Sequence, residues 1–184
     1  MRTLFWMVVL GVLGAFFARR PVKTLGAWEP RVIRIRLAET GTVLFYAAAV
    51  YLLDWNFPLT KASQVAAAAG WVLTLAGLAL AAWSRATLGR CFSVSLGVKQ
   101  DHDLVRSGPY AWMRHPMYTG LLALGLGGAL VHNSGLAVAL LVAPFGGFFY
   151  WQTRVEEPLL VARLGDAYRQ YQASTGRLLP RLMR

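Results

Sequence analysis

Hydrophobic residues fall into five long runs along the chain, each about as long as a helix needs to cross a bilayer, which is roughly 17–25 residues. The runs cover residues 4–18, 42–58, 62–83, 117–131 and 135–151. Only the second run contains an acidic residue, Asp54, and it lies near the end of that run. The pattern predicts an all-α fold, an integral membrane bundle of five transmembrane helices.

The segments outside these runs complete the predicted architecture. The turn at 132–135 joins the last two runs into a hairpin, so both outer ends of that hairpin meet the same face of the membrane. The loop at 84–115 is longer than a simple connection needs, which is typical of functional loops. Residues 153–174 place Leu160, Leu164, Tyr168 and Tyr171 on one face and predict a C-terminal amphipathic helix.

Two further features bear on how the helices end and pack. Pro158 is expected to break or restart the helix that leaves the fifth run, because proline removes a helical hydrogen bond. Ala62, Ala66, Gly70 and Thr74 recur every four residues in the third run and predict close packing of helix backbones. With no internal repeat, we expect a single domain over 1–184, with a three-helix part at 1–83 and the loop, hairpin and C-terminal helix at 84–184.

Positive charge lies almost entirely on one side of the predicted bundle. The net charge is +11, and 17 of the 19 Lys and Arg residues follow the first, third and fifth runs, which leaves Arg2 and Lys61. Cytoplasmic loops are enriched in Lys and Arg, so the N-terminus is expected outside and the C-terminus in the cytoplasm. A basic face also attracts the headgroups of a lipid bilayer, and this distribution argues against a nucleic-acid partner. Arg outnumbers Lys by 16 to 3, which favours a prokaryotic inner (plasma) membrane.

Several classes of site are excluded by the motifs that the sequence lacks. The single cysteine, Cys91, rules out an intrachain disulfide and a multi-cysteine metal site. No H-x-x-x-H or H-E-x-x-H is present, so no metal is expected. The sequence also lacks G-x-S-x-G, G-x-x-x-x-G-K-[ST] and a strand-linked G-x-G-x-x-G. All acids except Asp54 fall on the predicted cytoplasmic side, where polar chemistry therefore belongs.

Two polar segments remain, one at each outer end of the hairpin. Residues 102–120 read H-D-L-V-R-S-G-P-Y-A-W-M-R-H-P-M-Y-T-G, and residues 154–168 read R-V-E-E-P-L-L-V-A-R-L-G-D-A-Y. The hairpin brings both segments to the same face, so their Arg, His, Tyr and Glu side chains can meet. Taken alone, Arg114 and His115 are typical of residues that anchor a helix end at the headgroups. The glutamates of the second segment reach the same face, which favours a site shared by the two segments over simple anchoring.

These segments resemble the isoprenylcysteine carboxyl methyltransferase family and its phospholipid N-methyltransferase relatives. The matching patterns are H-x-L-V-x-x-G-P-Y-x-x-x-R-H-P-x-Y-x-G and, from Glu156 through Tyr171, E-E-x-x-L…G-x-x-Y-x-x-Y. The resemblance covers about residues 87–180. It implies a membrane enzyme that uses S-adenosylmethionine to methylate a lipophilic acceptor, most simply an isoprenylcysteine carboxylate.

The resemblance also implies roles for individual residues. Glu157 is the matched partner for the cofactor's ammonium group, with Glu156 left open as the alternative, and His115 or loop N–H groups would bind its carboxylate. Leu104, Val105 and Tyr110 would lie against the adenine, while Pro116 starts a helix whose N–H groups favour an anion. Arg154 would orient an acidic acceptor, and Arg154 and Glu157 are the expected catalytic residues. The expected cofactor-binding residues are His102, Leu104, Val105, Gly108, Tyr110, Arg114, His115, Pro116, Tyr118, Glu156 and Glu157.

The acceptor itself stays open at this point. A carboxylate acceptor needs little acid–base help, whereas an amine, such as that of a phospholipid, would need Glu156 or Glu157 as a base. Two hypotheses from other classes are a membrane reductase that uses NADPH on a sterol-like enone and a non-catalytic packing partner.

Overall fold

The computed structural model describes residues 64–89, 104–131 and 142–181, and the regular structure in this part of the chain is helical. Its elements are α3 (Gln64–Leu88), the short 3-10 helix η2 (Gly108–Ala111), α4 (Pro116–Val131), α6 (Ala143–Leu164) and α7 (Asp166–Ser174). The first two predicted spans, the turn at 132–135 and His102 lie outside the described residues. The all-α prediction is confirmed for the residues described, and the number of membrane spans stays a prediction.

Helix α3 is the part of the described chain that meets the length and hydropathy of a membrane span. Its 25 residues include a window of mean hydropathy 2.0, and a helix of this length is about 37 Å long. Helix α4 is also apolar but has 16 residues. The prediction that a loop begins at residue 84 is wrong, because α3 continues to Leu88 before Gly89 takes a φ of +47°. A glycine of positive φ commonly ends a helix in this way.

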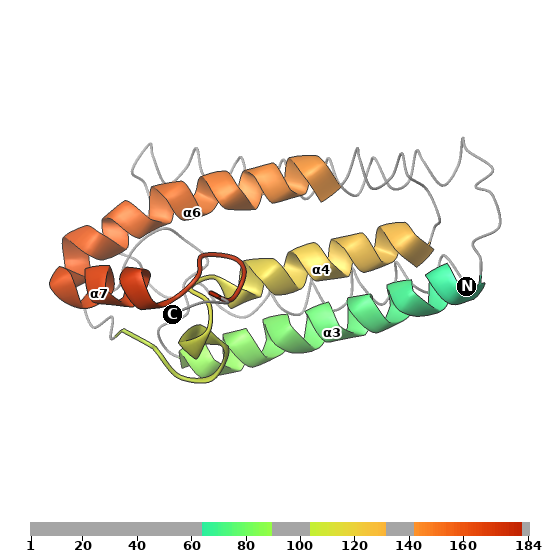
Figure 1. The fold of residues 1–184 in the computed structure, drawn as a ribbon, viewed down its shortest axis with the longest axis horizontal. Helices are drawn as coiled ribbons and strands as arrows, with labels where there is room; N and C mark the ends of the chain where they lie inside the picture. Colours follow the sequence, from blue (N-terminus) through green and yellow to red (C-terminus); the bar gives the residue numbers. More distant parts are fainter. Residues whose placement is uncertain (1–63, 90–103, 132–141, 182–184) are drawn as a thin grey trace.

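Helices α3 and α4 lie side by side along most of their length (Figure 1). The face of α3 toward α4 is made of small residues, as the four-residue spacing predicted for Gly70 and Thr74. A Cβ atom built on Gly77 would lie 2.5 Å from the carbonyl oxygen of Gly120 on α4. On α4, Gly127 lies against Thr74 and the backbone of Gly70. The two backbones therefore approach so closely that side chains at these positions are excluded.

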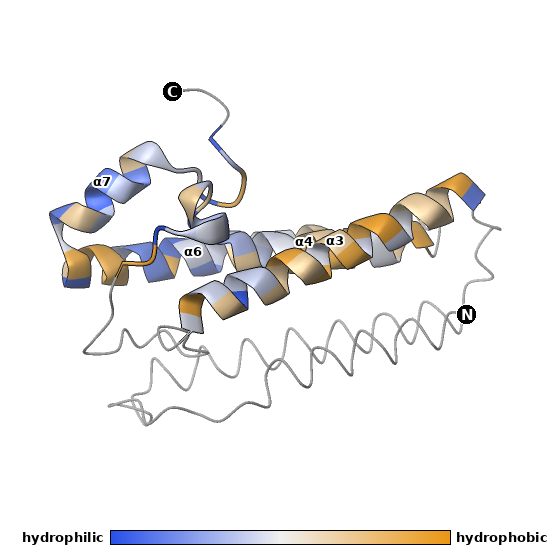
Figure 2. Cartoon of the chain, turned by 90° about the horizontal axis from the view of Figure 1, so that it is seen from below, coloured by the Kyte–Doolittle hydropathy of each residue, from blue (hydrophilic) through white to orange (hydrophobic). Residues whose placement is uncertain are grey.

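Helix α6 corrects two predictions about the C-terminal part of the chain. Pro158 lies inside α6, which continues to Leu164, so the expected break at Pro158 is wrong. The helix ends at Gly165, which has a φ of +59° that glycine adopts without the steric cost of a Cβ atom. The predicted amphipathic helix over 153–174 is therefore two pieces, the end of α6 and the separate helix α7. Figure 2 shows that α7 is mostly hydrophilic while α3 is mostly hydrophobic.

The chain after α7 returns to the start of α4. Figure 1 shows α7 and the following residues folded back toward the N-terminal end of α4. The backbone N–H groups of Arg114 and His115 donate to the carbonyl oxygens of Gly176 and Arg177, at 2.9 and 3.0 Å. Met113 and Gly176 form an isolated parallel bridge. These contacts fix the residues that precede α4 against the C-terminal segment.

The close approach of α3 and α4 predicts that Gly77→Ala destabilises the protein. The added methyl group would meet backbone atoms of Gly120 and Leu124 at 2.5 and 2.6 Å, and such overpacking costs about 1–3 kcal/mol. Gly147→Ala on α6 is the matched control, because nothing lies within 4 Å of its added Cβ. We expect a lower thermal midpoint in detergent for Gly77→Ala alone, and equal midpoints for the two variants would contradict the packing.

Candidate functional site

The first predicted segment is shaped by one glycine and two prolines. Gly108 has a φ of +57°, and a Cβ atom there would lie 3.0 Å from Thr87 Oγ1 of α3. Pro109 then occupies the start of the 3-10 helix η2. Pro116 is the first residue of α4, as predicted, where its missing N–H removes no helical hydrogen bond. This local structure leaves Arg114 and His115 between the short helix η2 and the start of α4, where both contact Glu157 of α6.

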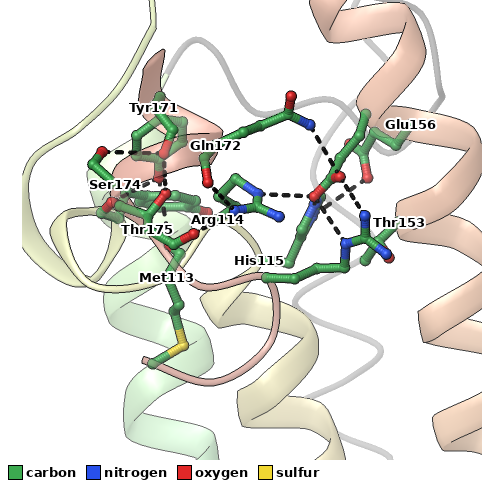
Figure 3. Close-up of polar contacts among 12 residues, drawn as sticks. Met113, Arg114, His115, Thr153, Glu156, Tyr171, Gln172, Ser174 and Thr175 are labelled. Carbon is green, nitrogen blue, oxygen red and sulfur yellow. Dashed lines mark hydrogen bonds and ion pairs between the residues drawn. The ribbon is translucent and has the colours of Figure 1, made fainter. Parts of the chain in front are cut away.

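The carboxylate of Glu157 is the centre of the site. Its Oε1 accepts hydrogen bonds from Arg114 Nε at 2.9 Å and Arg177 Nε at 3.2 Å, and lies 3.3 Å from His115 Nε2. Its Oε2 accepts hydrogen bonds from Arg177 Nη2 at 2.8 Å and Gln172 Nε2 at 3.1 Å. In Figure 3, Arg114 and His115 from the segment before α4 and Gln172 from α7 point toward one another. We call Glu157, Arg114, His115, Gln172 and Arg177 the Glu157 cluster.

The cluster explains how a carboxylate is buried here without becoming protonated. Glu157 is 3% exposed, and burial alone would raise its pKa. Hydrogen bonds from His115, Arg177 and Arg114, with the charge of Arg114, outweigh burial and lower the pKa from 4.5 to about 2. The carboxylate is therefore ionised throughout the physiological range and holds two guanidinium groups in place.

Glu156 lies beside Glu157 in the sequence but has a different environment. Its Oε2 accepts a hydrogen bond from the Tyr118 hydroxyl at 3.1 Å and lies 3.7 Å from His115 Nδ1. Its side chain is 31% exposed, against 4% for that of Glu157. Successive helical residues point about 100° apart, so one carboxylate faces the interior and its neighbour faces the rim of the site.

Aromatic stacking holds the start of α4 against α6. The rings of His115 and Tyr118 are stacked with centroids 5.5 Å apart, and Tyr118 stacks in turn on Phe149 at 4.8 Å. Stacked aromatic pairs add about 0.5–1.5 kcal/mol beyond the area that they bury. The stack therefore fixes the ring of His115 between the two glutamates.

A second set of contacts joins this segment to the chain around α7. The Tyr171 hydroxyl donates to the carbonyl oxygen of Tyr110 at 2.6 Å, and burial raises the pKa of Tyr171 to about 12 against the lowering effect of Arg114. Arg114 Nη1 donates to the carbonyl oxygens of Gln172, at 3.1 Å, and Thr175. Arg114 thus connects α7 to the Glu157 cluster through one side chain.

The structure brings together most of the residues that the sequence singled out. Those that meet around the two glutamates are Arg114, His115, Tyr118, Glu156 and Glu157. Tyr110 is buried in η2, Leu104 and Val105 are half-buried upstream of η2, and Gly108 packs on α3. Arg154 is exposed on α6 and lies outside the Glu157 cluster, so its expected role at an acceptor stays a prediction.

Sequence reasoning missed two members of the Glu157 cluster, Gln172 and Arg177. Both follow the last position of the matched pattern, Tyr171, and neither has a spacing that marks it as functional. The sequence feature that could have drawn attention to Arg177 is the T-G-R-L-L-P stretch at 175–180, in which a single arginine lies shortly before a proline. Only the return of this stretch to the start of α4 places Arg177 beside Glu157.

These contacts predict that Glu157→Gln destabilises the protein in a pH-dependent way. At neutral pH the variant leaves two guanidinium groups without their carboxylate, at a cost of about 3 kcal/mol. Because the folded-state pKa is lowered to about 2, this contribution is present above about pH 4.5 and is lost as the pH falls toward 2. Unfolding in non-ionic detergent is measured at several pH values. The difference in the free energy of unfolding between the variant and the unchanged protein should disappear as the pH falls across that range.

Glu156→Gln is the matched control for this comparison. It weakens one hydrogen bond, from Tyr118, which corresponds to about 1 kcal/mol. If Glu156→Gln lost as much stability as Glu157→Gln, the contacts described for Glu157 would be contradicted. A loss of stability in Glu157→Gln that does not change with pH would contradict them as well.

Comparisons with known proteins agree with the resemblance inferred from the two motifs. A family model described as phospholipid methyltransferase matches residues 65–167. Protein-S-isoprenylcysteine O-methyltransferase of Saccharomyces cerevisiae is 29% identical over 126 residues, which cover 67% of this chain and 53% of that protein. The Schizosaccharomyces pombe protein of the same name is 35% identical over 86 residues, or 46% of this chain and 36% of that one. The chain thus spans about half the length of the curated relatives it matches.

A solved structure shares the fold. It is that of a eukaryotic intramembrane Ras methyltransferase, isoprenylcysteine carboxyl methyltransferase, with a TM-score of 0.65 and 22% sequence identity. The match covers 93% of this chain and 60% of that one. The chain therefore shares the helical fold of that intramembrane protein. Since the family model covers more than half of the sequence, the chain belongs to the phospholipid methyltransferase family.

Proposed function

We propose that the chain is an integral membrane methyltransferase that uses S-adenosylmethionine and acts on a lipophilic acceptor. The observation that carries this proposal is the meeting of the two motifs, in which Arg114 and His115 contact Glu157 while Tyr118 contacts Glu156. Family membership and the curated relatives support the same activity. The acceptor that these relatives favour is an isoprenylcysteine carboxylate.

The two glutamates are suited to different tasks at such a site. A carboxylate offers about four acceptor positions, and Glu157 already meets donors from four side chains. Glu156 is partly exposed and accepts a hydrogen bond from Tyr118. Acceptor positions therefore remain on Glu156 for the ammonium group of the cofactor's amino-acid part. We assign ammonium binding to Glu156 and give Glu157 the task of holding the arginines.

In methyl transfer, the main task of the protein is to position the methyl donor and the acceptor. S-adenosylmethionine, when bound, supplies a methyl group on a sulfonium, which passes to a nucleophile in line with the breaking carbon–sulfur bond. The buried Glu157 cluster and the stack of His115 on Tyr118 hold their side chains rigidly, so little reorganisation is needed during the reaction. A basic side chain, for which Arg154, just before the second motif, is the candidate, would orient a carboxylate acceptor.

The name of the matched family favours a phospholipid amine as the second candidate acceptor. An amine must lose a proton as it is methylated, so a carboxylate would have to accept it. Glu157 is a poor base because its pKa lies near 2. Glu156 is then the better candidate for that task as well.

The distribution of charge supports a cytoplasmic position for the site. The segments that contain the site are rich in Arg, which follows the rule for cytoplasmic loops. We infer that the C-terminus lies in the cytoplasm of a prokaryotic cell, and that the acceptor enters from the bilayer.

The proposed activity predicts binding of S-adenosylhomocysteine to the detergent-purified protein in the micromolar range by calorimetry. It also predicts transfer of a labelled methyl group to one member of a panel of prenylcysteines, phosphatidylethanolamine, thiols and quinones. Binding of NADPH in place of S-adenosylhomocysteine would point to the reductase hypothesis. Binding of neither ligand, with no transfer to any acceptor, would favour a packing role and contradict the proposal.

The assignment of Glu156 predicts that Glu156→Gln weakens S-adenosylhomocysteine binding by about tenfold or more, because a charged hydrogen bond is worth about 1.5–3 kcal/mol. Binding of 5′-methylthioadenosine, which lacks the amino-acid part, should not change. The unfolding midpoint serves as the control for the fold. Unchanged affinity for S-adenosylhomocysteine in Glu156→Gln would show that the ammonium group binds elsewhere.

A further inference from the structure

The Glu157 cluster has more positive than negative charge. Arg114 and Arg177 both hydrogen-bond to the carboxylate of Glu157, so two guanidinium groups share one anion. An uncompensated charge that is partly removed from water is unfavourable. Glu156 makes its described contacts with Tyr118 and His115 rather than with either arginine. An additional anion beside the cluster would therefore be stabilised.

The two arginines differ in what they can offer to such an anion. Arg114 has a side chain that is 9% exposed, and its Nη1 is used by the carbonyl oxygens of Gln172 and Thr175. Arg177 has a side chain that is 25% exposed. Arg114 is thus enclosed by the protein, whereas Arg177 lies at the edge of the cluster.

Arg177 uses one edge of its guanidinium for Glu157. Nε and Nη2 donate to the two carboxylate oxygens at 3.2 and 2.8 Å. A guanidinium has five N–H groups in a planar fork, so a second edge, formed by Nη1 and the other N–H of Nη2, can bind another carboxylate. Within the described ranges 64–89, 104–131 and 142–181, Nη1 of Arg177 makes no hydrogen bond.

The position of Arg177 is fixed from three sides. Its carbonyl oxygen accepts the N–H of His115 at 3.0 Å, which ties its backbone to the start of α4. Its guanidinium carbon lies 5.5 Å from the ring centroid of Tyr150, a residue that is 52% exposed on α6. Glu157 accepts hydrogen bonds from Nε and Nη2, which form the inner edge of the guanidinium. The outer edge is therefore preorganised before any ligand arrives, which reduces the entropy lost on binding.

We propose that the outer edge of Arg177 binds the carboxylate of a ligand at this site. The proposal rests on the proposed methyltransferase function and adds a specificity residue that the two matched motifs do not contain. Two ligands would bring a carboxylate, namely the amino-acid part of the cofactor and an acidic acceptor. Both would be bound through paired, charge-assisted hydrogen bonds, a geometry that arginine provides and lysine does not.

The test compares Arg177→Gln and Arg177→Lys with Arg169→Gln, an exposed arginine on α7 whose partner is Asp166. For each variant, calorimetry gives the affinity for S-adenosylhomocysteine and for 5′-methylthioadenosine, and transfer assays give KM and kcat for a prenylcysteine carboxylate. We expect Arg177→Gln to lose about 10- to 100-fold in affinity for the ligand whose carboxylate it binds. Arg177→Lys should lose less, and Arg169→Gln should match the unchanged protein.

The pattern of losses identifies the source of the carboxylate. Weaker binding of S-adenosylhomocysteine with unchanged binding of 5′-methylthioadenosine assigns Arg177 to the cofactor. A higher KM for the prenylcysteine, with both nucleoside affinities unchanged, assigns Arg177 to the acceptor. Unchanged values throughout, or equal losses for both nucleosides, would overturn the proposal. If Arg177→Gln does not fold, Arg177→Lys decides by the same criteria, and a protein that binds no S-adenosylhomocysteine at all refutes the proposed function instead.

Discussion

The carboxylate of Glu157 lies buried where α6 passes the start of α4, and three otherwise separate parts of the chain are joined through it. A buried charge of this kind is stable only when it is paired and its acceptor positions are filled. Arg114 reaches it from the segment before α4, and Gln172 and Arg177 reach it from α7 and the residues that follow. Without this anion the guanidinium groups would repel each other, and the C-terminal segment would lose its side-chain contacts with Glu157 on α6.

The packing of α3 on α4 supports this arrangement from the apolar side. Small residues bring the two backbones into contact at Gly77 and Gly120, and Gly120 is the last residue of the R-H-P-x-Y-x-G motif. One motif therefore serves two purposes. Its polar half meets the glutamates of α6, and its final glycine sets the distance between α4 and α3. A substitution at Gly120 would displace the cluster even though the residue has no polar side chain.

The sequence predicted those parts of the structure that depend on local pattern. Hydrophobic runs located α4 and the start of α3, because apolar length and small-residue spacing are properties of a single helix, but the run at 62–83 stopped short of the end of α3 at Leu88. The meeting of the two motifs followed from hairpin geometry. Pro158 was misjudged because α6 continues through this exposed proline to Leu164, so a proline in the sequence did not mark the end of the helix. The positive φ of Gly165, not the proline, ends the helix.

The mutual contacts of Glu157, Gln172 and Arg177 were beyond sequence reasoning for a different reason. Adjacent glutamates look equivalent in a sequence, and only the orientation of α6 decides which one is buried. Arg177 depends on the chain reversing after α7, a long-range contact that no local spacing encodes.

The most direct test of the central claim is an experimental structure of the protein with S-adenosylhomocysteine bound. We expect the ligand's amino-acid part to lie between the two motifs, with its ammonium nitrogen within hydrogen-bonding distance of Glu156 and with Glu157 still bound by Arg114. A ligand bound away from these glutamates, or one that displaces Arg114 from Glu157, would contradict it.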